Sequence, residues 1–208
     1  MSALRVVIGE VSSGLSIIER EMGYIHRYYA ESLDPSSSSK LDLYLGDELI
    51  GQSVVYWISG RGEILGVIYY IAVDKRFRNR GFGKILVSSS ENYLEELGAD
   101  IIAASMREDN IASIRVFEDL GYALYRWSDL DDLCKNNFSE TLLRATCGYE
   151  DDYIAIKEIV SRTTSSNTHS LCRKLKSCID SLQEEIESHW RRHCYSPWRR
   201  ILRTRIRN

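Results

Sequence analysis

Several features are scarce or absent in this sequence of 208 residues, and each absence narrows the class of protein. No apolar stretch approaches the roughly 20 residues that cross a bilayer, so we expect no membrane partner. The start, MSALRVVIGEVSSG, has neither a basic first region nor a long apolar one, which predicts a cytoplasmic chain that is not exported. Gln52 and Gln183 are the only glutamines, and arginine outnumbers lysine. That bias hints at a thermophilic source.

CxxC pairs are also absent, although the sequence has five cysteines. Their odd number and the missing motif favour reduced thiols over disulfides. His189, His193 and Cys194 share a helix face at metal-ligand spacing, and His169 with Cys172 makes a second pair. In one continuous helix the two pairs would lie about 30 Å apart, so we predict no shared zinc site and no metal. The cysteines are Cys134, Cys147, Cys172, Cys178 and Cys194.

The net charge of -3 conceals an uneven distribution. From residue 161 onward, eleven basic residues stand against four acidic ones, which gives this segment +7 and leaves -10 for residues 1–160. An acidic body with a basic tail needs two explanations. The tail, with Trp198 among its arginines, could follow nucleic-acid phosphates, or it could lie on the acidic body of its own or a neighbouring subunit. We favour packing over nucleic-acid binding.

Hydrophobic periodicity predicts a mixed α/β domain over 1–160, with a helical extension over 161–208. We expect strands at 4–9, on both sides of a hairpin at Gly46-Asp47, and at 63–73, 99–106, 121–127 and 152–160. Ser12 or Ser13 would cap one helix running from Leu15 to Tyr29, and further helices are expected at 82–97 and 110–120. Residues 128–151 are polar and partly helical. After a hydroxyl-rich linker, a long helix presents an apolar face for packing or for a homo-oligomer, formed by Leu171, Leu175, Cys178, Leu182, Ile186 and Trp190.

The stretch RFRNRGFGK, residues 76–84, lies between a buried strand and a helix. The first N–H groups of a helix have no intrahelical partner and sit at the positive end of its dipole. Glycines let an anion approach those groups, and the surrounding arginines add charge. Two phosphate motifs are excluded, because Ile85 follows the lysine of a would-be P-loop and Leu86 occupies the third glycine of a dinucleotide fingerprint.

The residues before and after this turn resemble those of a known family. YIAVDKRFRNRGFGKILV, followed later by SMREDNIASIRVFEDLGY, closely resembles the acyl-CoA motifs of the GNAT superfamily of N-acyltransferases. The likeness covers roughly 65–160, and it is greatest to the N-terminal amine acetyltransferases of the ribosomal-protein alanine type. It implies the GNAT fold, a mixed and mostly antiparallel sheet flanked by helices. It also implies direct transfer of an acetyl group from acetyl-CoA to an amine, with a protein or peptide α-amine as the favoured acceptor.

The resemblance also implies roles for single residues. Main-chain groups of Ile71, Ala72 and Val73 would pair with the pantetheine arm like an added strand, and the Val73 N–H would face the thioester oxygen as an oxyanion donor. Asn110 would hydrogen-bond the cofactor near its thiol end, beside Phe117. The pyrophosphate would lie on the turn formed by Arg78, Asn79, Arg80, Gly81, Phe82, Gly83 and Lys84.

Two positions depart from the family pattern. Phe117 stands where a tyrosine usually protonates the leaving thiolate, and water could serve instead. Relatives place a carboxylate base at the positions of Ser105 or Val67, and neither of these side chains can take a proton. Tyr69, or Ser105 ordering a water, is the candidate base. Alternatives are a small-molecule or polyamine acetyltransferase, or a non-catalytic acyl-CoA-binding protein with a nucleic-acid-binding tail.

Overall fold

A computed structural model describes residues 3–159 and 168–206 of the chain. Seven strands form one sheet in the order β1-β2-β3-β4-β5-β7-β6. Every neighbouring pair is antiparallel except β4 and β5, which confirms the mixed, mostly antiparallel sheet predicted from the sequence. The strands are β1 (Leu4–Gly9), β2 (Ser38–Leu45), β3 (Glu48–Ser59), β4 (Ile64–Val73), β5 (Ile101–Met106), β6 (Ala123–Arg126) and β7 (Tyr153–Glu158).

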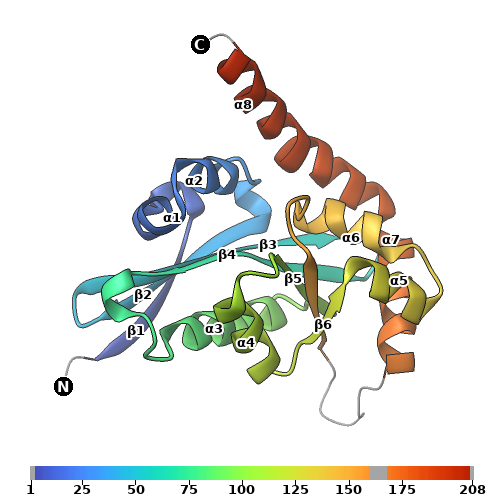
Figure 1. The fold of residues 1–208 in the computed structure, drawn as a ribbon, viewed down its shortest axis with the longest axis horizontal. Coiled ribbons are helices and arrows are strands. Elements are labelled where there is room, and N and C mark those ends of the chain that lie inside the picture. Colours follow the sequence, from blue (N-terminus) through green and yellow to red (C-terminus); the bar gives the residue numbers. More distant parts are fainter. Residues whose placement is uncertain (1–2, 160–167, 207–208) are drawn as a thin grey trace.

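Helices cover both faces of the sheet (Figure 1). One core layer joins Ile17 and Leu142 to Val54 and Tyr56 of the sheet, whereas Val55 belongs to the layer on the opposite face. This alternation along β3 is the period-2 pattern of a strand buried on both sides. The helices are α1 (Ser16–Met22), α2 (Tyr24–Glu31), α3 (Phe82–Glu96), α4 (Ile111–Asp119), α5 (Trp127–Cys134), α6 (Phe138–Thr146), α7 (Thr168–His189) and α8 (Ser196–Ile206), with a π-helical turn at Trp190–Tyr195.

The first helical region differs from the single capped helix that we expected. It is two helices, because Gly23 between α1 and α2 adopts φ of 100°, a value that L side chains rarely take. Ser12 and Ser13 lie in a short 3-10 turn, and the residue that caps α1 is Leu15, without a side-chain hydrogen bond. The apolar spacing is correct for Leu15 and Ile18, which are buried, but Ile25 is 38% exposed, and the spacing could not reveal the break.

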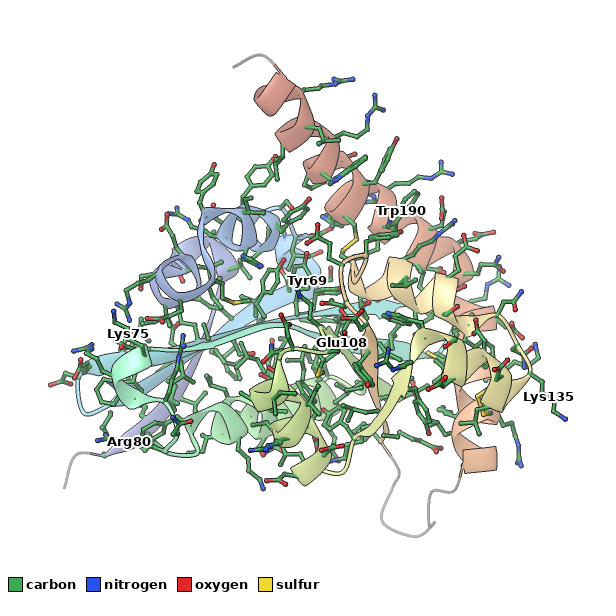
Figure 2. The ribbon with its side chains drawn as sticks, viewed as in Figure 1. Tyr69, Lys75, Arg80, Glu108, Lys135 and Trp190 are labelled. Carbon is green, nitrogen blue, oxygen red and sulfur yellow. A yellow bond between two sulfur atoms is a disulfide. The ribbon has the colours of Figure 1, made fainter. Side chains whose placement is uncertain are left out.

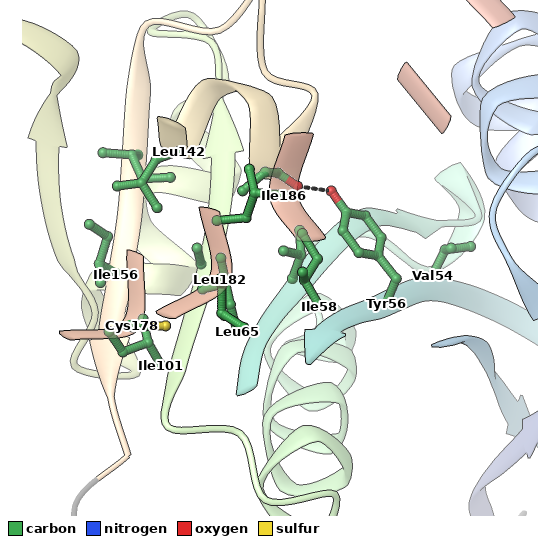
Figure 3. Packing of buried hydrophobic residues seen from close by; sticks show 14 of the residues in the cluster. Val54, Tyr56, Ile58, Leu65, Ile101, Leu142, Ile156, Cys178, Leu182 and Ile186 are labelled. Carbon is green, nitrogen blue, oxygen red and sulfur yellow. Dashed lines mark hydrogen bonds between the residues drawn. The ribbon is translucent and has the colours of Figure 1, made fainter. Parts of the chain in front are cut away.

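The apolar face of α7 packs against the sheet of its own chain. Leu182 and Ile186 are completely or almost completely buried in the same cluster as Leu65 and Ile101 (Figure 3). Polar contacts reinforce the packing, since the Lys174 ammonium lies 2.9 Å from carboxylate oxygens of both Glu63 and Asp100. The predicted packing role of this face is therefore confirmed within the chain, while association between copies stays a prediction.

The last helix, α8, projects beyond the sheet and the other helices (Figure 1). Tyr195 stacks on Trp198, with ring centroids 5.9 Å apart, and the Arg199 guanidinium lies over the Tyr195 ring. Both rings are partly exposed. Nucleic-acid binding by this basic, aromatic segment stays the less favoured of the two interpretations given above. None of the helices in the described ranges combines the length and apolar character needed to cross a membrane.

The expectation of reduced thiols is wrong for four of the five cysteines. Disulfides join Cys134 to Cys172 and Cys147 to Cys194, while Cys178 is a buried free thiol. Both bridges connect the α5–α6 region to the C-terminal helices, and the sequence separations of 38 and 47 residues contain no spacing signal that could have predicted them. Disulfides do not decide the compartment, because intracellular proteins of hyperthermophiles also carry them.

Candidate functional site

The two parallel strands at the centre of the sheet diverge. Pairing of β4 with β5 is limited to Leu65–Val67 against Ile101–Ala103, although both strands continue beyond these residues. On the β5 side, residues 68–73 of β4 therefore face no partner strand within the described part of the chain. An unpaired strand edge inside a sheet offers N–H and C=O groups to an extended ligand.

The register with β3 determines which groups point into this gap. The Asp74 N–H donates to the Ile50 oxygen at 2.9 Å, so residues 50 and 74 form a hydrogen-bonded antiparallel pair. Alternation then directs the main-chain groups of Ile71 and Val73 to the unpaired edge, and those of Ala72 to β3. The Val73 carbonyl accepts a hydrogen bond from Arg78 Nε at 3.0 Å. Of the three strand residues proposed to contact a cofactor, Ile71 and Val73 present their backbones to the gap.

The glycine turn follows directly after β4 and leads into α3. Asn79 and Gly81 both have positive φ, 61° and 82°, and Gly81 is the N-cap of α3. Alternating left-handed residues at a helix start gather backbone N–H groups into a concave anion site. A Cβ atom added at Gly81 or Gly83 would meet no heavy atom within 4 Å in the described structure. The space over the turn is therefore open, as a bound pyrophosphate requires.

The charged residues of the turn have different surroundings. Arg78 Nη2 donates to Glu21 of α1 at 2.7 Å, and Lys84 Nζ donates to Asp119 of α4 at 3.3 Å. The Arg80 guanidinium lies 5.7 Å from the centre of the Phe77 ring. Figure 2 marks Arg80 and Lys75 at this end of the sheet. The three cations surround the start of α3, where the helix dipole is positive.

Asp74 fixes the turn, and the sequence reasoning missed it. Its buried carboxylate accepts hydrogen bonds from the Arg76 backbone N–H at 2.9 Å and from Arg20 Nη2 of α1 at 2.6 Å. These hydrogen bonds, chiefly those of Arg76, lower the pKa of Asp74 to about 2. The charged carboxylate therefore links the end of β4, the turn and α1.

A second carboxylate, Asp151, lies at the other end of the gap. Ser105 of β5 donates a hydrogen bond of 2.6 Å to Asp151 Oδ2, and the loop before β7 carries Asp151 into this position. Burial raises the pKa of Asp151, against the hydrogen bond from Ser105, which lowers it. The Trp127 indole donates to the Asp151 carbonyl at 2.9 Å and holds the loop. A carboxylate therefore does lie beside position 105, although it belongs to a residue 46 positions later.

Tyr69 faces the same region from β4. The register with β3 shifts so that Val54 pairs with Tyr70 and Val55 with Ile68, which leaves Tyr69 as the extra residue of a bulge. The Tyr69 and Tyr70 rings stack with centroids 4.0 Å apart. Burial raises the pKa of Tyr69 well above its usual range, and the charge of Asp151 adds to the rise. Figure 2 shows Tyr69 near the middle of the molecule, with Glu108 on the strand–helix loop below it.

Asn110 and Phe117, the residues expected near the thiol end of the cofactor, belong to the start and the body of α4. Asn110 is the exposed N-cap of α4, and its Oδ1 accepts a hydrogen bond from the Ser113 N–H at 3.2 Å. Phe117 is buried, with its ring edge-on to Tyr122 at 4.9 Å. Tyr122 carries the phenolic hydroxyl nearest in sequence to Phe117, but burial raises its pKa far above the ordinary tyrosine value. Neither the Phe117 ring nor the Tyr122 hydroxyl is therefore suited to protonate a leaving thiolate.

The two groups of histidine and cysteine that the sequence places at metal-ligand spacing have different surroundings. His189 and Cys194 do lie close together, but Cys147, from α6, joins them. In the second pair, Cys172 is bonded to Cys134, and the His169 side chain lies outside the described residues. A hollow of about 440 Å³ opens beside His189, between the end of β3 and α7, and is remote from the strand gap and the glycine turn.

Comparison with known proteins assigns the chain to a family. The sequence profile of the Acetyltransferase (GNAT) family matches residues 13–122, which is more than half of the chain and includes the glycine turn. The chain belongs to the GNAT acetyltransferase family. The matched range runs from α1 to the end of α4, and so contains β4, β5 and the gap between them.

Two curated acetyltransferases are similar to part of this chain. An acetyltransferase of Pectobacterium atrosepticum is 37% identical over 81 residues, which are 39% of this chain and 57% of that protein. N-alpha-acetyltransferase 30 of Schizosaccharomyces pombe is 29% identical over 104 residues, 50% of this chain and 67% of that protein. The match thus spans little more than half the length of the first relative.

Solved structures share the GNAT fold. An IAA acetyltransferase from Bacillus cereus superposes with a TM-score of 0.54 at 13% identity, over 76% of this chain and 100% of that one. A GNAT family acetyltransferase from Elizabethkingia anophelis, solved with acetyl-CoA bound, gives a TM-score of 0.51 at 12% identity, over 75% and 98%. At these identities the likeness concerns the fold.

Proposed function

We propose that this chain transfers an acetyl group from acetyl-CoA to an amine, most readily to the α-amine of a protein or peptide. The observation that carries the proposal is the unpaired edge of β4 leading directly into the open glycine turn of α3. An extended, amide-rich arm fits the edge and an anion fits the turn. Acetyl-CoA contains both parts in that order. The Pectobacterium and fission-yeast relatives, which are named as acetyltransferases, support the same activity.

The residues that would hold acetyl-CoA follow from the geometry. The main-chain groups of Ile71 and Val73 would pair with the arm, and the amides of 79–84 would bind the pyrophosphate. Acetyl-CoA supplies the activated acyl group as a thioester. The Val73 N–H points to the gap, where it can donate to an oxygen that gains negative charge; such a donor is typically worth about 3–4 kcal/mol.

Asp151 is the proposed general base. It is half-buried and accepts a hydrogen bond from the Ser105 hydroxyl at 2.6 Å, beside the strand that borders the gap. Because burial raises its pKa, this carboxylate binds a proton more readily than an exposed aspartate does. Ser105 positions the carboxylate, and Tyr69 lines the same space with its hydroxyl neutral at pH 7.

The acceptor preference follows from the cost of removing a proton from the amine. At pH 7, deprotonating an α-amine of pKa near 8 costs about 1.4 kcal/mol, whereas a lysine ε-amine near 10.4 costs about 4.6 kcal/mol. An aspartate is a weak base for the second task even when its pKa is raised. The likeness to N-alpha-acetyltransferase 30 supports an α-amine.

The test is an assay of CoA release with acetyl-CoA and a panel of amines: peptides with free N-termini, polyamines and aminoglycosides. We expect turnover with the peptides, and a fall in kcat of about 10²–10⁴-fold in Asp151→Asn. Asp152→Asn is the matched control, since its carboxylate accepts the Glu108 N–H at 2.9 Å and does not bond Ser105. Turnover with none of the amines would refute the proposed activity, and unchanged kcat in Asp151→Asn would refute the base.

A further inference from the structure

Three ligand-type side chains from separate elements meet at the C-terminal side of the fold. Cys147 follows α6, His189 ends α7 and Cys194 lies in the π-helical turn. The two sulfur atoms and one imidazole nitrogen all lie within 4.8 Å of one another. Thiolates and imidazole are the ligands that Zn²⁺ prefers, and tetrahedral ligands at bonds of about 2.0–2.3 Å lie roughly 3.5–4 Å apart.

The π-helical turn brings two of the three groups together. In a regular α-helix, residues five apart point about 140° away from each other, because each residue turns the chain by about 100°. A π-helix pairs i with i+5, so the side chains at these positions lie one above the other. His189 and Cys194 are five residues apart, and the π-helix begins at Trp190. Local widening of the helix therefore places both on one side, facing Cys147.

His189 is held in place without a hydrogen bond to its buried nitrogen. Nε2 is shielded from solvent and has no hydrogen-bond partner in the described structure. The His189 ring stacks on Tyr56 with centroids 4.5 Å apart, and the Tyr56 hydroxyl donates to the Ala145 carbonyl, two residues before Cys147. A buried polar atom without a partner costs free energy, and a bound metal would satisfy it.

We propose that, when the Cys147–Cys194 disulfide is reduced, Cys147, His189 and Cys194 bind one Zn²⁺ ion. A phosphine reduces the disulfide with two electrons and is oxidised to the phosphine oxide, while water supplies the oxide's oxygen and the two protons of the new thiols. Binding then releases those two protons to solvent, as both sulfurs become thiolates and the neutral imidazole donates its lone pair. The same two cysteines are thus either joined by a disulfide bond or bound to the metal ion.

A hollow borders one of the three ligands, His189. His189, Arg192, His193 and Glu185 line this space of about 440 Å³, which is open to solvent. Water is the usual fourth ligand of a zinc ion that has three protein ligands. His193 donates from Nδ1 to the Ser32 carbonyl at 2.6 Å, so its ring is already anchored to α2's C-terminal end and stands beside the site.

The test uses the full chain, reduced with a phosphine and desalted without oxygen, then titrated with Zn²⁺ and separately with Co²⁺. We expect one tightly bound Zn²⁺ per chain. The Co²⁺ form should show the intense visible bands of tetrahedral cobalt, with sulfur-to-metal charge transfer. His189→Gln and Cys147→Ser should each weaken Zn²⁺ binding by more than about 100-fold, because both remove a ligand. The unreduced chain should bind no tight Zn²⁺.

The other disulfide provides the matched control. Cys134→Ser combined with Cys172→Ser removes that bridge and should leave Zn²⁺ binding by the reduced chain unchanged. The proposal is overturned if the reduced parent binds Zn²⁺ no more tightly than Cys147→Ser, or if Co²⁺ gives a spectrum without sulfur charge transfer. If either single variant fails to fold, the Co²⁺ spectrum of the parent still decides the ligands.

Discussion

Truncating Leu182 should reveal how strongly α7 belongs to the core. Leu182 is completely buried against the sheet, and its Cδ2 atom lies 2.7 Å from where a Cβ of Gly60 would be. Gly60 thus leaves space for this methyl group. If the leucine were shortened, the Gly60 backbone could fill the space only by moving the end of β3. Leu182→Ala should therefore leave a cavity and cost about 3 kcal/mol, within the 2–5 kcal/mol range of buried leucines.

For a chain of this length, a loss of about 3 kcal/mol corresponds to a fall in Tm of roughly 6–12 °C. Urea unfolding followed by circular dichroism gives the free energy, with the disulfides intact in both proteins. Leu202→Ala is the matched control, because Leu202 of α8 is 37% exposed and should change stability by less than about 0.5 kcal/mol. A Leu182→Ala loss no larger than that of Leu202→Ala would show that α7 packs elsewhere, for example between copies.

Three further outcomes follow from the site. Gly83→Asp should abolish the rise in Tm that acetyl-CoA gives the parent, since a carboxylate would repel the pyrophosphate over the turn; tight binding by this variant would refute the turn as the cofactor site. A peptide with a free N-terminus and blocked lysine should be acetylated with higher kcat/KM than the reverse peptide, and a faster lysine-only peptide would mean a stronger base than Asp151. Activity requires ionised Asp151, so kcat/KM should fall as the pH drops through its raised pKa. Ser105→Ala removes a hydrogen bond that favours the ionised carboxylate, so this variant should lose activity at a higher pH than the parent does. An unchanged pH profile would contradict the role of Asp151.

The sequence predicted those parts of the site that lie within continuous stretches. The glycine turn, the strand before it and the helix after it are consecutive, so local pattern was sufficient to place Gly81 and Gly83 at the start of α3. The break at Gly23 was missed, because apolar spacing continues across it and only the backbone angle reveals the two helices.

Parts of the site formed by distant residues could not be predicted in this way. Asp151 is one of several acids in the run YEDD, and the sequence gives no reason to choose it. It meets Ser105 because β7 pairs with β5 in a register that sets Ser105 opposite Ile154, three residues after Asp151. The disulfides depend likewise on how α5 and α6 lie against the C-terminal helices, a relation that no short motif encodes.

The two disulfides also determine the covalent connectivity of the chain. The loops closed by Cys134–Cys172 and Cys147–Cys194 overlap, and both include all of β7 and the segment 160–167 that follows it. A single cut of the peptide chain within that segment would therefore release nothing. The fragment carrying α7 and α8 would remain bonded to the one carrying the sheet, and the two would separate on a gel only after reduction. After such a cut, the disulfide-bonded molecule would therefore keep its full size although each polypeptide in it is shorter.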